Sequence, residues 1–184
     1  MGSRKVTRSD GSVRMKAGVL FVGAVLMIPL GTAHAGEGDS DALTFRQIVF
    51  SSAIGDVMQG PYAIAIPPDN DDLYVSAFLA RRIVHFERRA GGELSFVDSV
   101  PSRLQMGGAP MDVFQIVASP NNQFIYAAVG DVTLGGGIVR FDRDLSNGQL
   151  SFGGALPSNG SLMQGLHSPV FLARPSDGRH LYVL

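Results

Sequence analysis

The chain has 184 residues, of which 45% are hydrophobic and 17% charged, with 23 Gly, 10 Pro, no Cys and a formal net charge of −1. This composition is typical of a folded, turn-rich globular protein and excludes a disordered chain or a coiled coil. Because cysteine is absent, disulfides, thiol nucleophiles, Cys-ligated zinc and iron–sulfur clusters are excluded too.

The first 35 residues have the pattern of a secretory signal peptide. A short apolar run follows Lys16, and Ala33-His34-Ala35 supplies the small residues of a cleavage site. The run is shorter than the ~20 apolar residues of a permanent membrane helix, so an uncleaved anchor is the disfavoured alternative. Either Met15 or Met1 is the true start, and residues 1–14 then lie upstream of the signal or extend it. We expect cleavage after Ala35, a periplasmic or secreted protein and no permanent membrane span.

Residues 36–184 contain no lysine and carry a net charge of about −5. Nucleic-acid binding requires clustered Lys and Arg. The basic pairs Arg81-Arg82 and Arg88-Arg89 both flank a predicted strand, where solvated strand ends are the favoured interpretation. We therefore expect no nucleic-acid partner.

Residues 43–50 form the first predicted strand, and residues 61–99 form the first complete unit. Four apolar runs, rich in β-branched and aromatic residues, make up this unit: Tyr62–Ile66, Leu73–Phe78, Ile83–Phe86 and Leu94–Val97. Turn-forming residues separate the runs, including the Pro68–Asp72 segment. This pattern predicts four antiparallel strands.

Residues 111–155 repeat this design, and residues 169–184 begin it again. The predicted strands of the second unit are Val113–Ala118, Phe124–Val129, Ile138–Phe141 and Leu150–Phe152. Asn147-Gly148 between the last two is a strong hairpin signal. The segments that align with one another are Ile64–Val75, Ile116–Ala127 and Phe171–Val183. Self-similarity at a period of about 50 residues indicates a repeat architecture.

A four-stranded sheet cannot bury both of its apolar faces alone, whereas radially stacked sheets bury them against each other. We therefore predict an all-β fold: a β-propeller of four-stranded antiparallel blades, incomplete, with about two full blades and partial flanking blades. It would occupy residues 36–184, with the signal peptide in residues 1–35. Because propellers close with about four to eight blades, we expect a fragment of a longer chain. Self-assembly into a closed ring is the alternative.

Three segments carry a resemblance to a known family: Pro68–Val75, Ile83–Arg88 and Ile138–Arg143. They resemble the lactonase-like seven-bladed β-propellers, which include 6-phosphogluconolactonase, carboxymuconate cyclase and the YVTN-repeat proteins. The resemblance covers residues 43–184. A WD40 propeller is disfavoured because the chain has no Trp, and the kelch pattern is not reproduced. The matching residues are turn and core residues, so they are specific for the fold and weak for the activity.

In such a propeller, ligands normally bind at the mouth of the central channel. The loops expected there are 51–61, 100–111 and 157–168, with the middle loops near 79–82 and 130–137. The candidate ligand-binding residues in these loops are Asp56, Arg103, Gln105, Asp131 and His167. Lactone hydrolysis needs a base and a group that holds the developing oxyanion. His167 is the candidate base and Arg103 the candidate anion clamp, although a plain loop histidine and a surface arginine are the favoured interpretations.

The sequence departs from the family at one informative place. Some lactonase-like members carry Gly-Pro-Arg-His before an inner strand, with the Arg and His facing the channel, whereas this chain has Gly60-Pro61-Tyr62-Ala63. We therefore expect an exported propeller that binds a sugar, a lactone or a protein partner without catalysis. A sugar lactone hydrolase, with its catalytic residues in blades outside this sequence, is the alternative.

We expect neither a metal nor a cofactor. The acidic segment Asp69–Asp72 lacks the Gly and the distal Glu of an EF-hand calcium loop. It also aligns with plain turns in the other repeats, which favours a structural turn.

Overall fold

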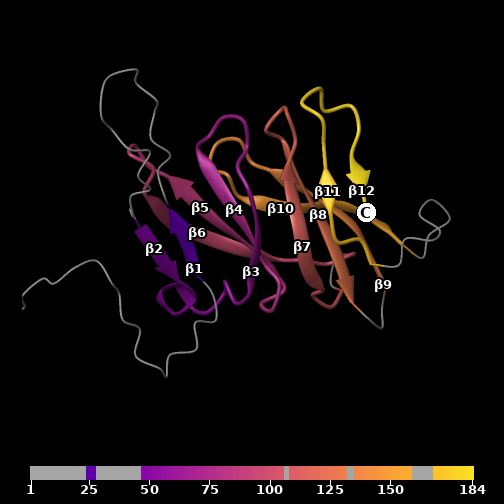
Figure 1. The fold of residues 1–184 in the computed structure, drawn as a ribbon, viewed down its shortest axis with the longest axis horizontal. Coiled ribbons are helices and arrows are strands. Elements are labelled where there is room, and N and C mark those ends of the chain that lie inside the picture. Colours follow the sequence, from indigo (N-terminus) through magenta and orange to yellow (C-terminus); the bar gives the residue numbers. More distant parts are fainter. Residues whose placement is uncertain (1–23, 28–46, 106–107, 132–134, 159–167) are drawn as a thin grey trace, which may run out of the picture.

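The computed structural model describes residues 24–27, 47–105, 108–131, 135–158 and 168–184. In these residues the fold is all-β apart from one 3-10 turn, η1 (Ser51–Ile54). Two four-stranded antiparallel sheets lie side by side, and a two-stranded sheet flanks each of them (Figure 1). No helix within the described residues has the length and apolar character needed to span a bilayer.

The first blade contains four strands in sequence order: β3 (Pro61–Ala65), β4 (Asp72–Ala77), β5 (Arg82–Arg88) and β6 (Leu94–Pro101). These are the four strands predicted between residues 61 and 99. The β3–β4 turn contains Asn70 with φ 68°, and Asn is one of the few residues that tolerates this left-handed conformation. All six residues of β4 are buried, because both faces of this sheet are covered.

The second blade repeats the arrangement. Its strands are β7 (Asp112–Ala118), β8 (Phe124–Asp131), β9 (Gly135–Arg143) and β10 (Leu150–Pro157). Asn122 occupies the turn position of Asn70 and has φ 63°. The predicted repeat is therefore confirmed at the level of both strand order and turn conformation.

Two partial sheets lie at the ends of the arc. β1 (Ala24–Met27) pairs with β2 (Gln47–Phe50), and β11 (Leu172–Ala173) pairs with β12 (Tyr182–Val183), both antiparallel. Residues 43–46 of the first predicted strand lie outside the described residues. β1 belongs to the apolar run of the predicted signal peptide, so the expected cleavage after Ala35 would remove it; that cleavage stays a prediction.

Each sheet buries its apolar faces against its neighbours. One cluster lies between the first blade and the η1 segment, and it includes Met58, Val75 and Phe86. A larger cluster lies between the two blades, and a third joins the second blade to the β11–β12 sheet. Burying one large apolar side chain contributes roughly 1.5–3 kcal/mol, so these junctions supply the main stabilisation. Sheets that bury their faces against one another in this way are the blades of a propeller, and the described residues form two blades and parts of two more.

Candidate functional site

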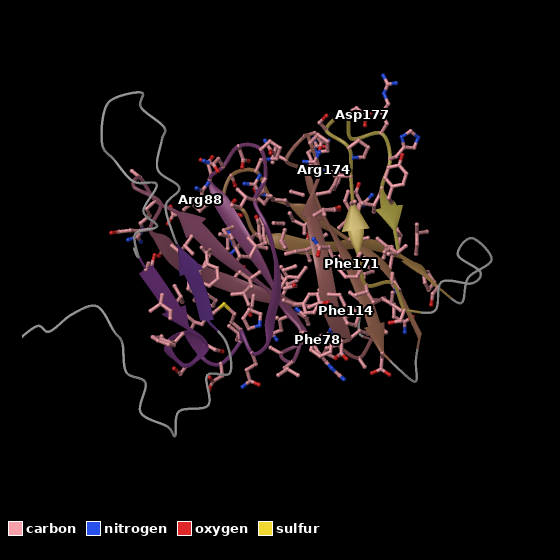
Figure 2. The ribbon with its side chains drawn as sticks, in the orientation of Figure 1. Phe78, Arg88, Phe114, Phe171, Arg174 and Asp177 are labelled. Atoms are coloured by element: carbon pink, nitrogen blue, oxygen red, sulfur yellow. The ribbon has the colours of Figure 1, made fainter. Side chains whose placement is uncertain are left out.

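Three aromatic side chains meet at one end of the inner strands, and we call them the mouth cluster: Tyr62, Phe78 and Phe114. The ring centroids are 5.9 Å apart for Tyr62 and Phe114, 5.2 Å for Phe78 and Phe114, and 6.3 Å for Tyr62 and Phe78. Tyr62 remains 50% exposed. Figure 2 shows Phe78 and Phe114 close together, at the end of the sheets opposite Arg174 and Asp177.

Backbone irregularities place these rings. The β3–β4 register shifts between Pro61 and Ala63, so Tyr62 leaves the regular ladder. The β7–β8 register shifts in the same way around Phe114, between Val113 and Ile116. Such bulges re-aim side chains near functional sites. Tyr62 and Phe114 occupy the same position in successive repeats, which is the signal that sequence reasoning could have used and did not.

Gly60 lets the entry of β3 approach the β4–β5 turn closely. A Cβ at this position would lie 2.8 Å from Leu79 Cγ, and its φ of 63° also favours glycine. The carbonyl of Gly60 accepts a hydrogen bond from the Phe78 N–H at 2.8 Å. The Gly-Pro pair before Tyr62 therefore positions the aromatic cluster.

A charged cluster lies at the same end. Arg81, in the β4–β5 turn, places Nε 2.7 Å from Asp112 Oδ1 and a terminal nitrogen 3.7 Å from Asp131 Oδ2. The Arg81 side chain is 44% exposed, so screening by solvent makes these ion pairs weak. One cation and two carboxylates leave this cluster with a net charge of −1. Asp131, predicted as a site residue, thus contacts Arg81 next to the mouth cluster.

Of the other predicted site residues, the three that the structure describes do not join Asp131. Arg103 and Gln105 line a separate cavity of about 200 Å³ with Val100, Phe141 and Phe152, beside the outer strands β6, β9 and β10. Within the described residues, Nε of Arg103 is buried and has no hydrogen-bond partner. Asp56 lies on the turn after η1, where its N–H donates to the Ser51 carbonyl. His167 lies outside the described residues.

A buried polar network joins the two blades. Arg143 of β9 places Nη1 2.6 Å from Asp69 Oδ2, and its Nε donates to Asp72 Oδ2 at 3.2 Å and to the Tyr74 hydroxyl at 2.9 Å. On the other side of Asp72, Nε2 of His85 lies 2.8 Å from Oδ1. His85 also stacks on Tyr74, with ring centroids 4.9 Å apart.

The network sets the ionisation of its members. Burial by itself would raise the pKa of Asp72, but hydrogen bonds from His85 and Arg143 outweigh burial and hold that pKa below its ordinary value. Burial and the nearby Asp72 carboxylate raise the pKa of Tyr74. Asp72 is therefore ionised and Tyr74 neutral at pH 7. Because these groups are occupied by one another inside a junction, the network is suited to holding the blades together and not to binding a ligand.

A larger cavity, which we call the outer groove, lies between the second blade and the β11–β12 sheet. Its volume is about 730 Å³. Phe124, Tyr126 and Ile138 line it from the blade, together with Arg140. Of the predicted site residues, none of those that the structure describes lines this groove.

Comparison with known proteins places the fold. Neither a family model nor a curated protein sequence matches the chain. A structure of a proposed 6-phosphogluconolactonase from Bacteroides uniformis matches with a TM-score of 0.65 and 18% identity, over 88% of this chain and 41% of that chain. A second, from Bacteroides fragilis, has a TM-score of 0.55 and 22% identity, over 67% and 31%.

A third similar structure is a periplasmic gluconolactonase from Pseudomonas aeruginosa, with a TM-score of 0.53 and 19% identity over 67% of this chain and 32% of that chain. The chain thus spans less than half the length of each of these proteins. At such identities the likeness establishes the fold alone. The chain has the fold of the lactonase-like β-propellers, of which it contains two blades and parts of two more.

Proposed function

We propose that the protein is an exported propeller that binds a small sugar-like molecule, a lactone or a protein partner at the mouth cluster, without catalysis by the residues of this chain. The observation that carries the proposal is the exposed ring of Tyr62 beside Phe78 and Phe114. Aromatic rings provide apolar faces for stacking, and the Tyr hydroxyl adds a hydrogen-bonding group.

Catalysis at this mouth lacks support. Tyr62-Ala63 stands where some family members carry Arg-His, so neither an imidazole base nor a guanidinium is supplied from this position. The nearby Arg81 is paired with Asp112 at 2.7 Å. Lactone hydrolysis needs both a base and a group free to hold the developing oxyanion.

Export is part of the proposal. The basic start, the short apolar run and Ala33-His34-Ala35 support it. One protein of the same fold is described as periplasmic. An exported protein would also encounter unphosphorylated ligands. The net negative charge of the cluster of Arg81, Asp112 and Asp131 agrees with an uncharged ligand, because it would repel a phosphate group.

A lactone hydrolase is the second candidate. It is supported by the names of the similar structures, two proposed 6-phosphogluconolactonases and a gluconolactonase. In this case the catalytic residues would belong to blades outside this sequence, and the mouth cluster would contribute only substrate contacts.

Two measurements on the purified chain test the proposal. We expect no acceleration of δ-gluconolactone hydrolysis above the buffer rate, followed by acid release. We also expect at least one compound from a panel of sugars and lactones to raise the melting temperature, and this rise to disappear in Tyr62→Ala. Hydrolysis above the buffer rate that Tyr62→Ala reduces would contradict the non-catalytic assignment.

A further inference from the structure

The cavity that Arg103 and Gln105 line, which we call the Arg103 cavity, is apolar apart from these two side chains. Its other lining residues come from strands of both four-stranded blades: Val100, Pro101, Phe141, Leu150 and Phe152. The cavity thus lies between the two blades and not against either partial sheet. Its volume of about 200 Å³ exceeds the ~150 Å³ at which an apolar protein cavity binds benzene. One small ring therefore fits inside it.

Arg103 carries the only charge among the described residues that line this cavity. Its Nε is buried and has no hydrogen-bond partner, and within the described part of the chain no carboxylate forms an ion pair with its guanidinium. Burying part of a cation costs free energy unless a partner compensates it. A carboxylate matches the planar guanidinium best, because it can accept two parallel N–H···O bonds. The unpaired Arg103 therefore points to an anionic ligand.

The backbone around Arg103 is held in place on both sides. Ser102 is buried, and its carbonyl accepts a hydrogen bond from the Met111 N–H at 2.8 Å. Leu104 packs against the apolar cluster between the blades. Because both neighbours are anchored, binding at Arg103 does not require a loop to be ordered first, which lowers its cost. Gln105 is exposed and lines the cavity, so a ligand can enter beside it.

We infer that the Arg103 cavity binds a small monocarboxylate with an apolar or aromatic tail, such as benzoate. The carboxylate would pair with the Arg103 guanidinium, the Gln105 amide would donate to one of its oxygens, and the tail would contact Phe141 and Phe152. A phosphate is disfavoured, because a single cation would leave part of its charge unpaired in an apolar cavity. A sugar is disfavoured as well, because apolar walls cannot satisfy its hydroxyl groups. This is a second site, independent of ligand binding at the mouth cluster.

Thermal melts of the full chain with sodium benzoate at pH 7 test the inference, with sodium chloride holding the ionic strength constant. A ligand of this size binds with a Kd on the order of 1 mM. At ten times its Kd it should raise the melting temperature by roughly 3–6 °C. Benzyl alcohol has the same ring without a charge, and it should bind at least about tenfold more weakly.

Three variants assign the response to this cavity. Arg103→Met should bind benzoate at least about tenfold more weakly, whereas the free variant should melt no lower than the unchanged protein, because Arg103 has no partner to lose. Arg103→Gln replaces it if Arg103→Met does not fold by circular dichroism. Arg89→Met is the matched control, since the Arg89 side chain is 59% exposed, and it should keep the full response. Tyr62→Ala should keep it too, which separates this cavity from the mouth cluster.

Each opposite result overturns the inference. The charge of the ligand is not recognised if benzoate gives no rise in melting temperature or if benzyl alcohol gives the same rise. Benzoate binds elsewhere if Arg103→Met responds as the unchanged protein does, and it binds at the mouth cluster if Tyr62→Ala abolishes the response. If inorganic phosphate gives an Arg103-dependent rise equal to that of benzoate, the cavity accepts anions in general and the monocarboxylate assignment is wrong.

Discussion

Arg143 and Asp72 form an ion pair across the junction between the two blades, with the Arg143 side chain only 2% exposed. Apolar burial is not directional, so it allows neighbouring sheets to slide, whereas a guanidinium held by two carboxylates and a phenol has one geometry. Asp69, Asp72 and Tyr74 belong to the first blade and Arg143 to the second. The pair therefore fixes the register of one blade on the next.

Replacing Arg143 with Met should lower the free energy of unfolding by about 3–5 kcal/mol, because the buried Asp72 carboxylate then loses its main cation. Urea denaturation measures this loss. Arg88→Met is the matched control, because Arg88 has the same position in the first blade. Within the described residues its side chain forms hydrogen bonds only to Asn70, at an exposed site, and a loss of about 1 kcal/mol or less is expected. Equal losses of unfolding free energy in the two variants would show that the ion pair between the blades contributes no more than the exposed Arg88.

Acid should weaken this junction in a defined interval. The pKa of Asp72 is lowered in the folded protein. Its contribution to stability is therefore fully present when the pH is above the pKa of Asp in the unfolded chain, about 3.9. The contribution is lost as the pH falls from there through the lower pKa of the folded protein. We expect the melting temperature to fall on going from pH 5 to pH 3. Asp72→Asn should be less stable at pH 7 and show a shallower fall over the same interval. If melting temperature falls with pH equally steeply in the two proteins, Asp72 does not contribute to the loss of stability in acid.

Tyr62→Ala should abolish the rise in melting temperature that a bound ligand gives. The melting temperature of the free protein should stay nearly unchanged, because the exposed ring contributes little to the core. Thermal melts with and without ligand measure both effects. Tyr182→Ala is the control, since Tyr182 is also exposed but lies on β12, away from the mouth cluster. A loss of ligand response in both variants, or a large loss of intrinsic stability in Tyr62→Ala alone, would contradict the role given to Tyr62.

Gly136→Ala should destabilise the second blade by roughly 1–3 kcal/mol, the usual cost of overpacking. A Cβ at this position would lie 2.4 Å from the Val129 carbonyl oxygen and 3.0 Å from the Gly130 Cα. Both are backbone atoms of the paired strand β8, so they cannot move aside as a side-chain end would. Urea denaturation of the variant gives the loss. An unchanged midpoint would mean that β8 and β9 are less closely apposed than described.

Residue pattern alone predicted the repeat and its strands. The four runs between Tyr62 and Val97 became β3 to β6, and Asn70 and Asn122 took the turn conformations that their chemistry favours. This worked because alternation, turn residues and φ preferences act within a few residues. His85, inside the third of these runs, is packed within the sheet and is 1% exposed.

The candidate site was predicted less well. Asp131 lies beside the mouth cluster, but Arg103 and Gln105 follow an outermost strand and lie in a separate cavity. The aromatic residues Tyr62, Phe78 and Phe114 were missed. Register shifts at Tyr62 and at Phe114, which no local pattern announced, take two of the three rings out of the regular ladder. Loop length alone does not specify which sheet edge a loop residue will face.

The sequence by itself determined the strands, the turns and the period at which they recur, because each depends on interactions between near neighbours in the chain. Only the tertiary structure decided that Arg143 meets Asp72 and that three aromatic rings share one mouth. Those contacts join segments tens of residues apart, and the stacking of whole sheets selects them.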